Sequence, residues 1–202
     1  MNAAGIPVPA QTTAPRPMRA DAQRNYDRLL KAAVAAFAEH GADDVSLEEI
    51  ARRAGVGIGT LYRHFPTRQA LLEAVYTDQV EALRVRAREL QQADSPAEAL
   101  AAWLRALTTF SSTKRNLTSA LLETLGKDSA LLSTCAATIC GAADDLLVRA
   151  KEAGVVRADI DPKDLIRLVH GVNIATQNPT DPGQADRLLG LILDGLRPQP
   201  SG

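Results

Sequence analysis

The stretch from Val56 to Phe65 constrains the fold of this chain more than any other. It follows a short run, Ser46 to Ala54, and a break at Gly55, and this order predicts a helix, a turn and a second helix. At about 100° per residue, Leu61 and Phe65 fall on one side of that second helix. One side of the helix is therefore expected to pack into a core, and the other is left for a partner.

The side opposite Leu61 has an unusual composition for a surface helix. Gly59 and Arg63 lie there, with Thr60 and Tyr62 on the two flanks. The outward surface is thus a flexible cation bordered by two hydroxyl groups, with no carboxylate among them, which suits a polyanion. Glycine inside a helix costs up to about 1 kcal/mol relative to alanine. A position without a side chain allows a partner to approach the backbone closely, which is one reason to tolerate that cost.

The ends of the two helices also carry recognisable signals. Ser46 is expected to be the N-cap of the first helix, and Glu49 three residues later completes the pattern of a capping box. Gly57 is expected to cap the second helix, a role in which glycine is only slightly worse than serine.

Three segments carry a resemblance to a known family: 46–56, 59–65 and 68–72. Together they resemble the DNA-binding domain of the TetR family of transcriptional regulators, over about 21–76. The rest of the chain resembles that family in length and helical pattern only. Many members have serine where this chain has Gly57, and a polar residue is common where it has Ile58, so the operator sequence stays open.

The resemblance implies an all-α fold, with a three-helix helix-turn-helix DNA-binding head joined to a larger helical ligand-sensing and dimerisation body. The expected division is a disordered tail at 1–19, a head at 20–79 with its helix-turn-helix at 46–65, a body at 80–197 and a short tail at 198–202. The predicted DNA-binding residues are Ser46, Ile58, Gly59, Thr60, Tyr62, Arg63, His64 and Arg68. Of these, Ile58, Thr60 and Arg63 are expected to reach base edges, while Ser46, Tyr62, His64 and Arg68 hold phosphates.

Helical periodicity continues through the body, and no run shows the two-residue alternation of strands. The first helix of the head is expected at about 22–40, and a helix from Arg68 to Leu90 crosses into the body without a Pro/Gly linker. Further helices are expected at about 97–113, 117–125 and 129–153. Asp161-Pro162 and Asp181-Pro182 each give an N-cap followed by proline, which predicts the start of a helix.

The last two helices are expected to form an association surface. Their apolar stripes are Leu165, Ile166, Val169 and Val172, then Ala185, Leu188, Leu189, Ile192 and Leu196, and Gly190 would permit close approach of a neighbouring helix. The family resemblance implies a homodimer through 162–197. From the residues alone, both stripes serve equally well as the core of a monomer.

The body is also expected to hold a small-molecule effector. The candidate lining residues are Trp103, Phe110, Thr124, Thr138, His170 and Asn173, although a core position is the alternative for each one alone. Stacked rings and an acid are needed to enclose a planar cationic drug, and this body has few rings. We therefore expect an effector that is small or aliphatic.

Other function classes have little support in the sequence. The chain has three histidines and no metalloprotease, phosphate-loop or serine-hydrolase motif, so we expect no enzyme, no metal and no cofactor. Cys135 and Cys140 lie in one apolar helical pattern, which is typical of a reducing cytoplasm. No stretch approaches the roughly eighteen apolar residues of a membrane span, and we expect no membrane partner.

The net charge of −1 gives no global attraction to nucleic acid, so the functional interpretation rests on the motif. We expect a cytoplasmic DNA-binding transcriptional regulator, and specifically a ligand-released repressor that binds a near-palindromic operator as a homodimer. The alternative is a helical interaction or redox-sensing protein whose head does not bind DNA.

Overall fold

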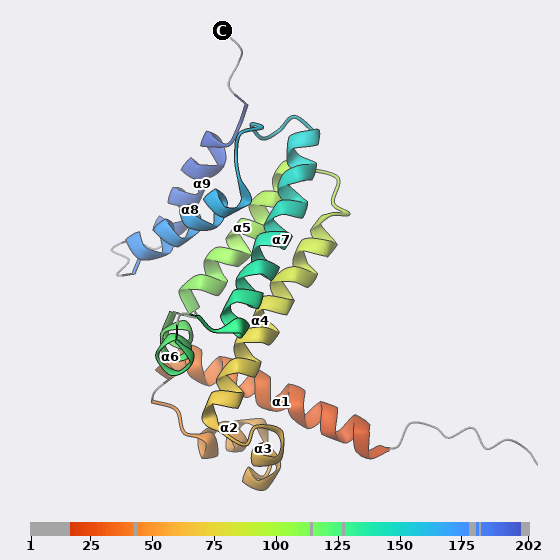
Figure 1. The fold of residues 1–202 in the computed structure, drawn as a ribbon, viewed down its shortest axis with the longest axis vertical. Helices are drawn as coiled ribbons and strands as arrows, with labels where there is room; N and C mark the ends of the chain where they lie inside the picture. The colour runs from red at the N-terminus through yellow and green to blue at the C-terminus, as the bar shows by residue number, and fades with distance from the viewer. Residues whose placement is uncertain are drawn as a thin grey trace, which may run out of the picture.

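The computed structural model describes residues 17–42, 44–113, 115–126, 128–177, 181 and 183–198, and all regular structure within them is helical. The elements are α1 (Pro17–His40), α2 (Leu47–Ala54), α3 (Ile58–His64), α4 (Arg68–Leu90), α5 (Pro96–Thr113), α6 (Arg115–Leu125), α7 (Ala130–Glu152), α8 (Pro162–Ala175) and α9 (Gln184–Gly195). The expected all-α fold is confirmed. Figure 1 shows a small head built from α1, α2 and α3 below a larger helical body.

The head closes around side chains that the helical periodicity had pointed inward. Leu29 and Ala33 of α1 are fully buried, and they share one core with Ile50 of α2, Leu61 of α3 and Leu71 of α4. Fully burying a side chain of this kind contributes about 1.5–3 kcal/mol. A few such residues are enough to hold three short helices together.

The first helix begins earlier than the sequence pattern indicated. It starts at Pro17 rather than near Ala22, so 17–19, expected in the tail, belong to α1. Proline is well suited to a first turn, because its φ is already helical and the amide hydrogen it lacks would have no intrahelical partner. The remainder of the predicted disordered tail, residues 1–16, lies outside the described residues, as do 199–202 of the short C-terminal tail.

Helix α4 joins head and body as one uninterrupted element (Figure 1). It runs from Thr67, whose side chain accepts a hydrogen bond from the amide of Ala70, to Leu90. The guanidinium of Arg149 in α7 donates to the carbonyl of Leu90 at 3.2 Å and also to that of Ala93. The upper end of α4 is thus fastened to α7 beside it.

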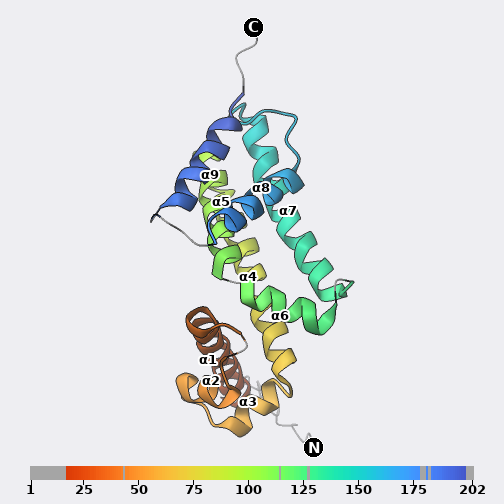
Figure 2. The ribbon, with the colours of Figure 1, turned by 90° about the vertical axis from the view of Figure 1, so that its left-hand side faces the viewer.

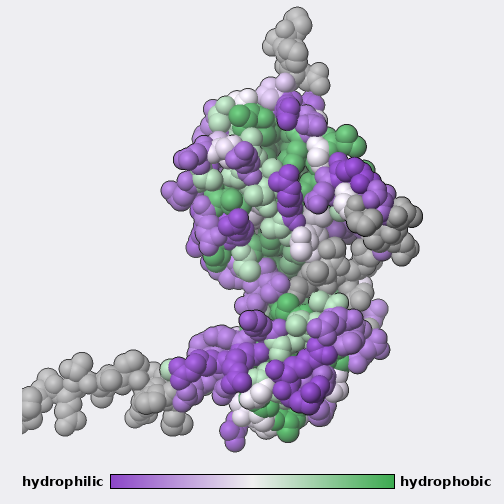
Figure 3. Space-filling view, turned by 180° about the vertical axis from the view of Figure 1, so that it is seen from behind, coloured by the Kyte–Doolittle hydropathy of each residue, from purple (hydrophilic) through white to green (hydrophobic). Residues whose placement is uncertain are grey.

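The body packs the remaining helices around α4. Helix α7 lies along α4, α5 contacts α4, α7, α8 and α9, and α6 lies near the waist between body and head. Figure 2 shows α8 crossing in front of α5 and α7, with α9 beside it. Apolar and polar side chains alternate over the body surface in Figure 3, whereas the visible face of the head is largely hydrophilic.

Within the described part of the chain, one helix, α7, is long and apolar enough to span a membrane by length and composition alone, contrary to the expectation from the sequence. This carries little weight, because core helices of compact proteins meet the same criteria. One face of α7 buries Cys135, Ile139, Ala143 and Leu146 against its neighbours.

The two Asp-Pro signals have different outcomes. Asp161 caps α8 as expected, and its carboxylate accepts a hydrogen bond from the amide of Lys163 at 2.7 Å. The prediction at Asp181 was wrong: α9 begins at Gln184 with Gly183 as its N-cap, at φ +88°. The carboxylate of Asp181 binds the guanidinium of Arg187 at 2.5 Å instead of capping the helix.

Candidate nucleic-acid interface and effector cavity

Helix α2 is held by the cap that the sequence predicted, but only half of the capping box forms. The hydroxyl of Ser46 accepts a hydrogen bond from the amide of Glu49 at 3.1 Å. The carboxylate of Glu49 does not return to Ser46, because it accepts from Arg53 at 2.7 Å and from Arg52 at 2.9 Å. The hydrogen bonds from Arg53 and then Arg52 hold the pKa of this carboxyl below its usual range.

The turn between α2 and α3 depends on Gly55, which adopts φ +62°. A Cβ at this position would also lie 2.7 Å from Nη2 of Arg28 and would displace that flexible side chain. The positive φ is the main reason for glycine here. Gly57 then provides the N-cap of α3 with an extended backbone and no side-chain hydrogen bond. The tight turn fixes α3 across α2 with its outer side exposed.

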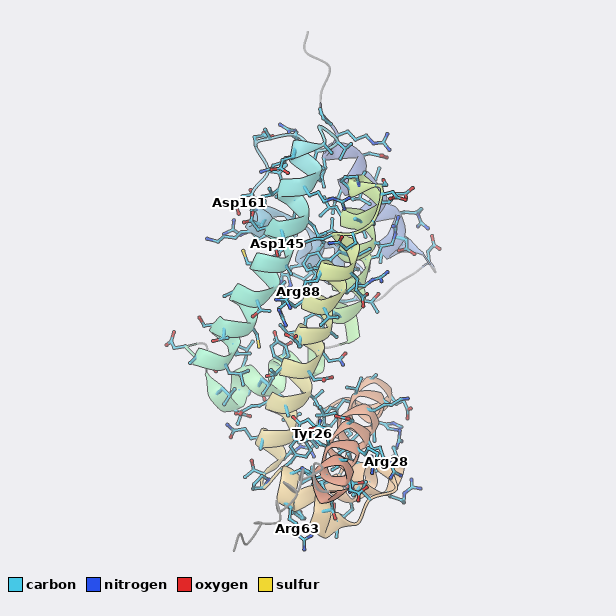
Figure 4. The ribbon with its side chains drawn as sticks, turned by 90° about the vertical axis from the view of Figure 1, so that its right-hand side faces the viewer. Tyr26, Arg28, Arg63, Arg88, Asp145 and Asp161 are labelled. Carbon is cyan, nitrogen blue, oxygen red and sulfur yellow. The ribbon has the colours of Figure 1, made fainter. Side chains whose placement is uncertain are left out.

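Helix α3 presents the surface that the spacing predicted. Leu61 is fully buried, while 39% of Ile58 and 45% of Tyr62 is exposed. Gly59 and Arg63 are exposed as well, and Thr60 is half-buried. Figure 4 shows Arg63 at the outer end of the head, pointing away from the body. Exposed aliphatic and aromatic groups beside a cation on one short helix form a surface that needs a partner.

Most other cations of the head are already engaged. Arg24 pairs with Asp21, Arg52 with Glu49, and Arg53 with both Glu39 and Glu49. Arg63 has no ion-pair partner within the described part of the chain. It is therefore available to an external anion or hydrogen-bond acceptor at no cost in broken contacts.

Two predicted phosphate ligands have internal contacts. The imidazole of His64 is half-buried and packs edge-on against Tyr26, with ring centroids 5.8 Å apart. The guanidinium of Arg68 donates to the carbonyl of Val45 at 2.6 Å and to that of Ala42. Arg68 thus ties the start of α4 to the segment before α2. This arrangement gives it a structural role, and its phosphate contact stays a prediction.

A cavity of about 620 Å³ opens in the body between α5, α6 and α8. Phe110, His170 and Asn173, three of the six predicted effector residues, line it together. Sequence reasoning missed most of its wall, which comprises Tyr76, Leu107, Ser111, Thr118, Ser119, Leu122, Ile139, Ile166, Arg167, Ile174 and Gln177. Tyr76 was recognisable only as an apolar-stripe residue of α4, because nothing in the sequence indicates which core residues border a cavity.

The other three predicted effector residues lie elsewhere. Trp103 is completely buried, and its indole nitrogen donates to the carbonyl of Leu83 at 3.0 Å. The hydroxyls of Thr124 and Thr138 donate to carbonyls one turn earlier in their own helices, at 2.7 Å and 3.0 Å. None of the three borders this cavity.

Tyr76 connects the cavity to the helix that enters the head. Its ring lies 6.0 Å from that of Phe110, centroid to centroid. Burial raises the pKa of its phenol, and a side-chain hydrogen bond with Thr118 partly offsets that effect. A molecule filling the cavity would contact α4 directly through this side chain.

The environment of Cys135 gives little support to the redox alternative. Cys135 is buried, and its burial raises the pKa of the thiol, partly offset by a hydrogen bond with Thr77. A raised pKa disfavours the thiolate, which is the form that reacts with oxidants.

The outward faces of α8 and α9 differ from the predicted stripes. Leu165, Val169, Val172, Leu189 and Leu196 are buried within the monomer, so these residues form its core. The exposed surface carries Leu168 at 43% and Leu191 at 69%, with Gly171, Ala175 and Gly195 also exposed. Ile166, Ala185, Leu188, Gly190 and Ile192 are half-buried.

Two parts of the chain match known families. Residues 29–75 match the family described as bacterial regulatory proteins of the tetR family. Residues 95–198, more than half of the chain, match the C-terminal domain described as transcriptional regulator SbtR-like. The chain belongs to the TetR family of transcriptional regulators.

Solved structures of TetR-family proteins extend the likeness over nearly the whole chain. The TetR transcriptional regulator SCO0520 from Streptomyces coelicolor is 40% identical, with a TM-score of 0.77, over 86% of this chain and 99% of that one. A TetR transcription regulatory protein from Mycobacterium vanbaalenii is 37% identical, with a TM-score of 0.72, over 90% of this chain and 100% of that one.

Curated relatives match over a shorter stretch of the chain. The helix-turn-helix regulator SAUSA300_2515 from Staphylococcus aureus is 43% identical over 54 residues, which is 27% of this chain and 29% of that protein. The match therefore spans less than a third of the length of this relative.

Proposed function

We propose that this TetR-family protein is a ligand-released repressor that binds a near-palindromic operator as a homodimer. The observation that carries the proposal is the outward face of α3, where exposed Ile58 and Tyr62 lie beside Arg63, a cation with no ion-pair partner among the described residues. A helix with this face, fixed at the tip of a head, suits the major groove of DNA.

The proposed DNA contacts divide into two kinds. Arg63, Thr60 and Ile58 read base edges, with Ile58 placed to contact a thymine methyl. Gly59 lets the backbone of α3 approach the DNA, because nothing lies within 4 Å of the Cβ position there. Tyr62, His64 and the Ser46 segment contact phosphates, which fix the register without reading sequence.

The dimer is proposed to form through the outward faces of α8 and α9, within residues 162–197. Exposed leucines at 168 and 191 next to exposed glycines at 171 and 195 suit close packing of helices from a second copy. A two-fold dimer presents two α3 helices, so the operator half-sites should be separated by about 34–36 Å or a multiple of that distance.

The effector is proposed to occupy the cavity between α5, α6 and α8 and to act through α4. The ligand favours a conformer in which α4 has swung and the two α3 helices no longer match the groove spacing. A hundredfold preference for that conformer amounts to about 2.7 kcal/mol, enough to release an operator held marginally. A cytoplasmic regulator with no catalytic role is consistent with this mechanism.

The decisive experiment is selection of bound fragments from a random DNA library, followed by gel shifts on the enriched sequence. Recovery of one inverted repeat, bound with a stoichiometry of two chains, supports the proposal. If the protein enriches no sequence, or binds all duplexes alike, the alternative that the head is an interaction module would be favoured.

A further inference from the structure

A second cavity adjoins the proposed effector cavity. It measures about 650 Å³ and lies between α7 and the start of α8. Four residues line both cavities: Tyr76 of α4, Ile139 of α7, and Ile166 and Arg167 of α8. The two spaces therefore adjoin at one shared wall beside α8, which crosses the body in Figure 2, and together they are called the slot.

The charges along this slot are unequal. Among the described residues, the lining of the cavity between α5, α6 and α8 includes Arg167 and His170 and no carboxylate. The described lining of the cavity between α7 and α8 adds Lys163 and the acid Asp144. The permanently charged groups of the described lining are therefore two cations and one acid, and Arg167 lies at the shared wall.

The cation at that wall is only lightly engaged. Arg167 pairs with Asp164 one turn earlier on α8 at 3.2 Å, with 76% and 52% of the two side chains exposed. Exposed pairs of this kind contribute little to stability, so the guanidinium can turn to another anion. Most of the remaining wall is aliphatic or aromatic, including Leu107, Leu122 and Ile174.

We infer that the effector is an elongated amphiphile with an anionic end, bound with its anion at Arg167 and its apolar chain along the slot. The inference rests on the proposed effector role of the cavity between α5, α6 and α8. It extends that role by assigning a chemical class of ligand and by joining the second cavity to the site.

The test is isothermal titration calorimetry on the full chain without DNA. The probes are straight-chain saturated carboxylates of increasing length, their methyl esters, and alkyltrimethylammonium ions of matched length, all below their micelle concentrations. The carboxylate should bind roughly tenfold more tightly than the ester, because the ester loses a charge-assisted hydrogen bond. Affinity should rise roughly fourfold for each methylene that becomes buried.

Two variants locate the parts of the ligand. Arg167→Gln should abolish the preference for the acid over the ester. Arg197→Gln is the matched control, since Arg197 pairs with Asp194 at the same spacing at 3.1 Å and is 75% exposed; this variant should keep the preference. Gly141 lines the second cavity with open space around its Cβ position, so Gly141→Leu should weaken the longer chains and spare the shorter ones.

Several outcomes would contradict these expectations. Equal binding of acid, ester and ammonium probes, or an acid preference that survives Arg167→Gln, overturns the anionic assignment. Long-chain binding that is unchanged in Gly141→Leu overturns the joined slot. Operator release by a neutral or cationic molecule, with no carboxylate binding, overturns this inference and leaves the repressor proposal intact. Carboxylate binding in the expected pattern without operator release would support the ligand class and contradict ligand-released repression.

Discussion

The indole nitrogen of Trp103 in α5 donates a hydrogen bond to the carbonyl of Leu83 in α4, 3.0 Å away. No part of the Trp103 side chain is exposed. This hydrogen bond therefore joins α5 to α4 at Leu83, closer to the C-terminal end of α4 than Tyr76, which lines the cavity.

Replacing Trp103 should lower the stability of the fold and leave effector binding unchanged. Trp103→Phe removes the donor and some core volume, and we expect a loss of about 1–3 kcal/mol in the free energy of unfolding. Urea denaturation measures that loss, and calorimetry on the folded variant should give unchanged effector affinity. Weaker binding by fully folded protein would restore Trp103 to the effector site.

Arg63→Ala should weaken operator binding by about 1–3 kcal/mol and relax the preference at one base position. The reason is that the exposed guanidinium of Arg63 is proposed to bind a base edge. Gel shifts against the selected operator and its single-base variants provide the measurement. Arg24→Ala, which removes an exposed cation of α1 already paired with Asp21, should have little effect. Equal losses in both variants would mean that only overall charge matters.

Gly59→Ala separates folding from recognition. The added methyl group meets nothing within 4 Å, and alanine favours a helix over glycine by up to about 1 kcal/mol. Thermal unfolding should therefore show a head that is as stable or more stable, while the gel shift shows weaker operator binding. Unchanged operator affinity would show that DNA does not approach this part of α3.

Arg68→Ala tests the structural role of this guanidinium. Losing hydrogen bonds to the carbonyls of Val45 and Ala42 should cost about 1.5–3 kcal/mol. Hydrogen exchange should then increase in the segment between α1 and α2. If Arg68 were instead a phosphate ligand, exchange would be unchanged and DNA affinity would fall alone.

Leu191→Glu should convert the dimer to monomers that stay folded, because this side chain is 69% exposed in the isolated chain. Light scattering with circular dichroism checks both points. Val85→Glu on α4, which is 42% exposed, is the control and should remain dimeric. Leu189→Glu places a charge in the monomer core and should unfold the body. A dimer that persists in Leu191→Glu would exclude this face of α9 from the interface.

The head was predictable because its determinants are local. The cap at Ser46, the glycine turn and the spacing of Leu61 and Phe65 act within a few residues, and each appears in the structure as expected. The internal contacts of Arg68 could not be predicted, for the opposite reason. Its partners lie 23 and 26 residues earlier, and no periodicity shows where a long flexible side chain will end.

The body was predictable as helices but not as surfaces. An apolar stripe marks the side of a helix that is buried, and it does not show whether the same chain or a second copy buries it. On α9 the stripe through Leu189 and Leu196 is monomer core, while Leu191 stands outside it. Only three of the six predicted effector residues line the cavity between α5, α6 and α8. The reason is related, since the shape of a cavity depends on how five helices pack together.

The bond from Arg68 to the segment before α2 also affects how the molecule can be divided. A chimera that joined this head to another body at residue 66 would leave the carbonyls of Ala42 and Val45 without their donor. A junction further along α4, after about residue 79, would carry the donor with the head. Recombination between relatives should therefore preserve the first turns of α4 together with the head. The segment that is exchanged as a whole would then be longer than the segment proposed to contact DNA.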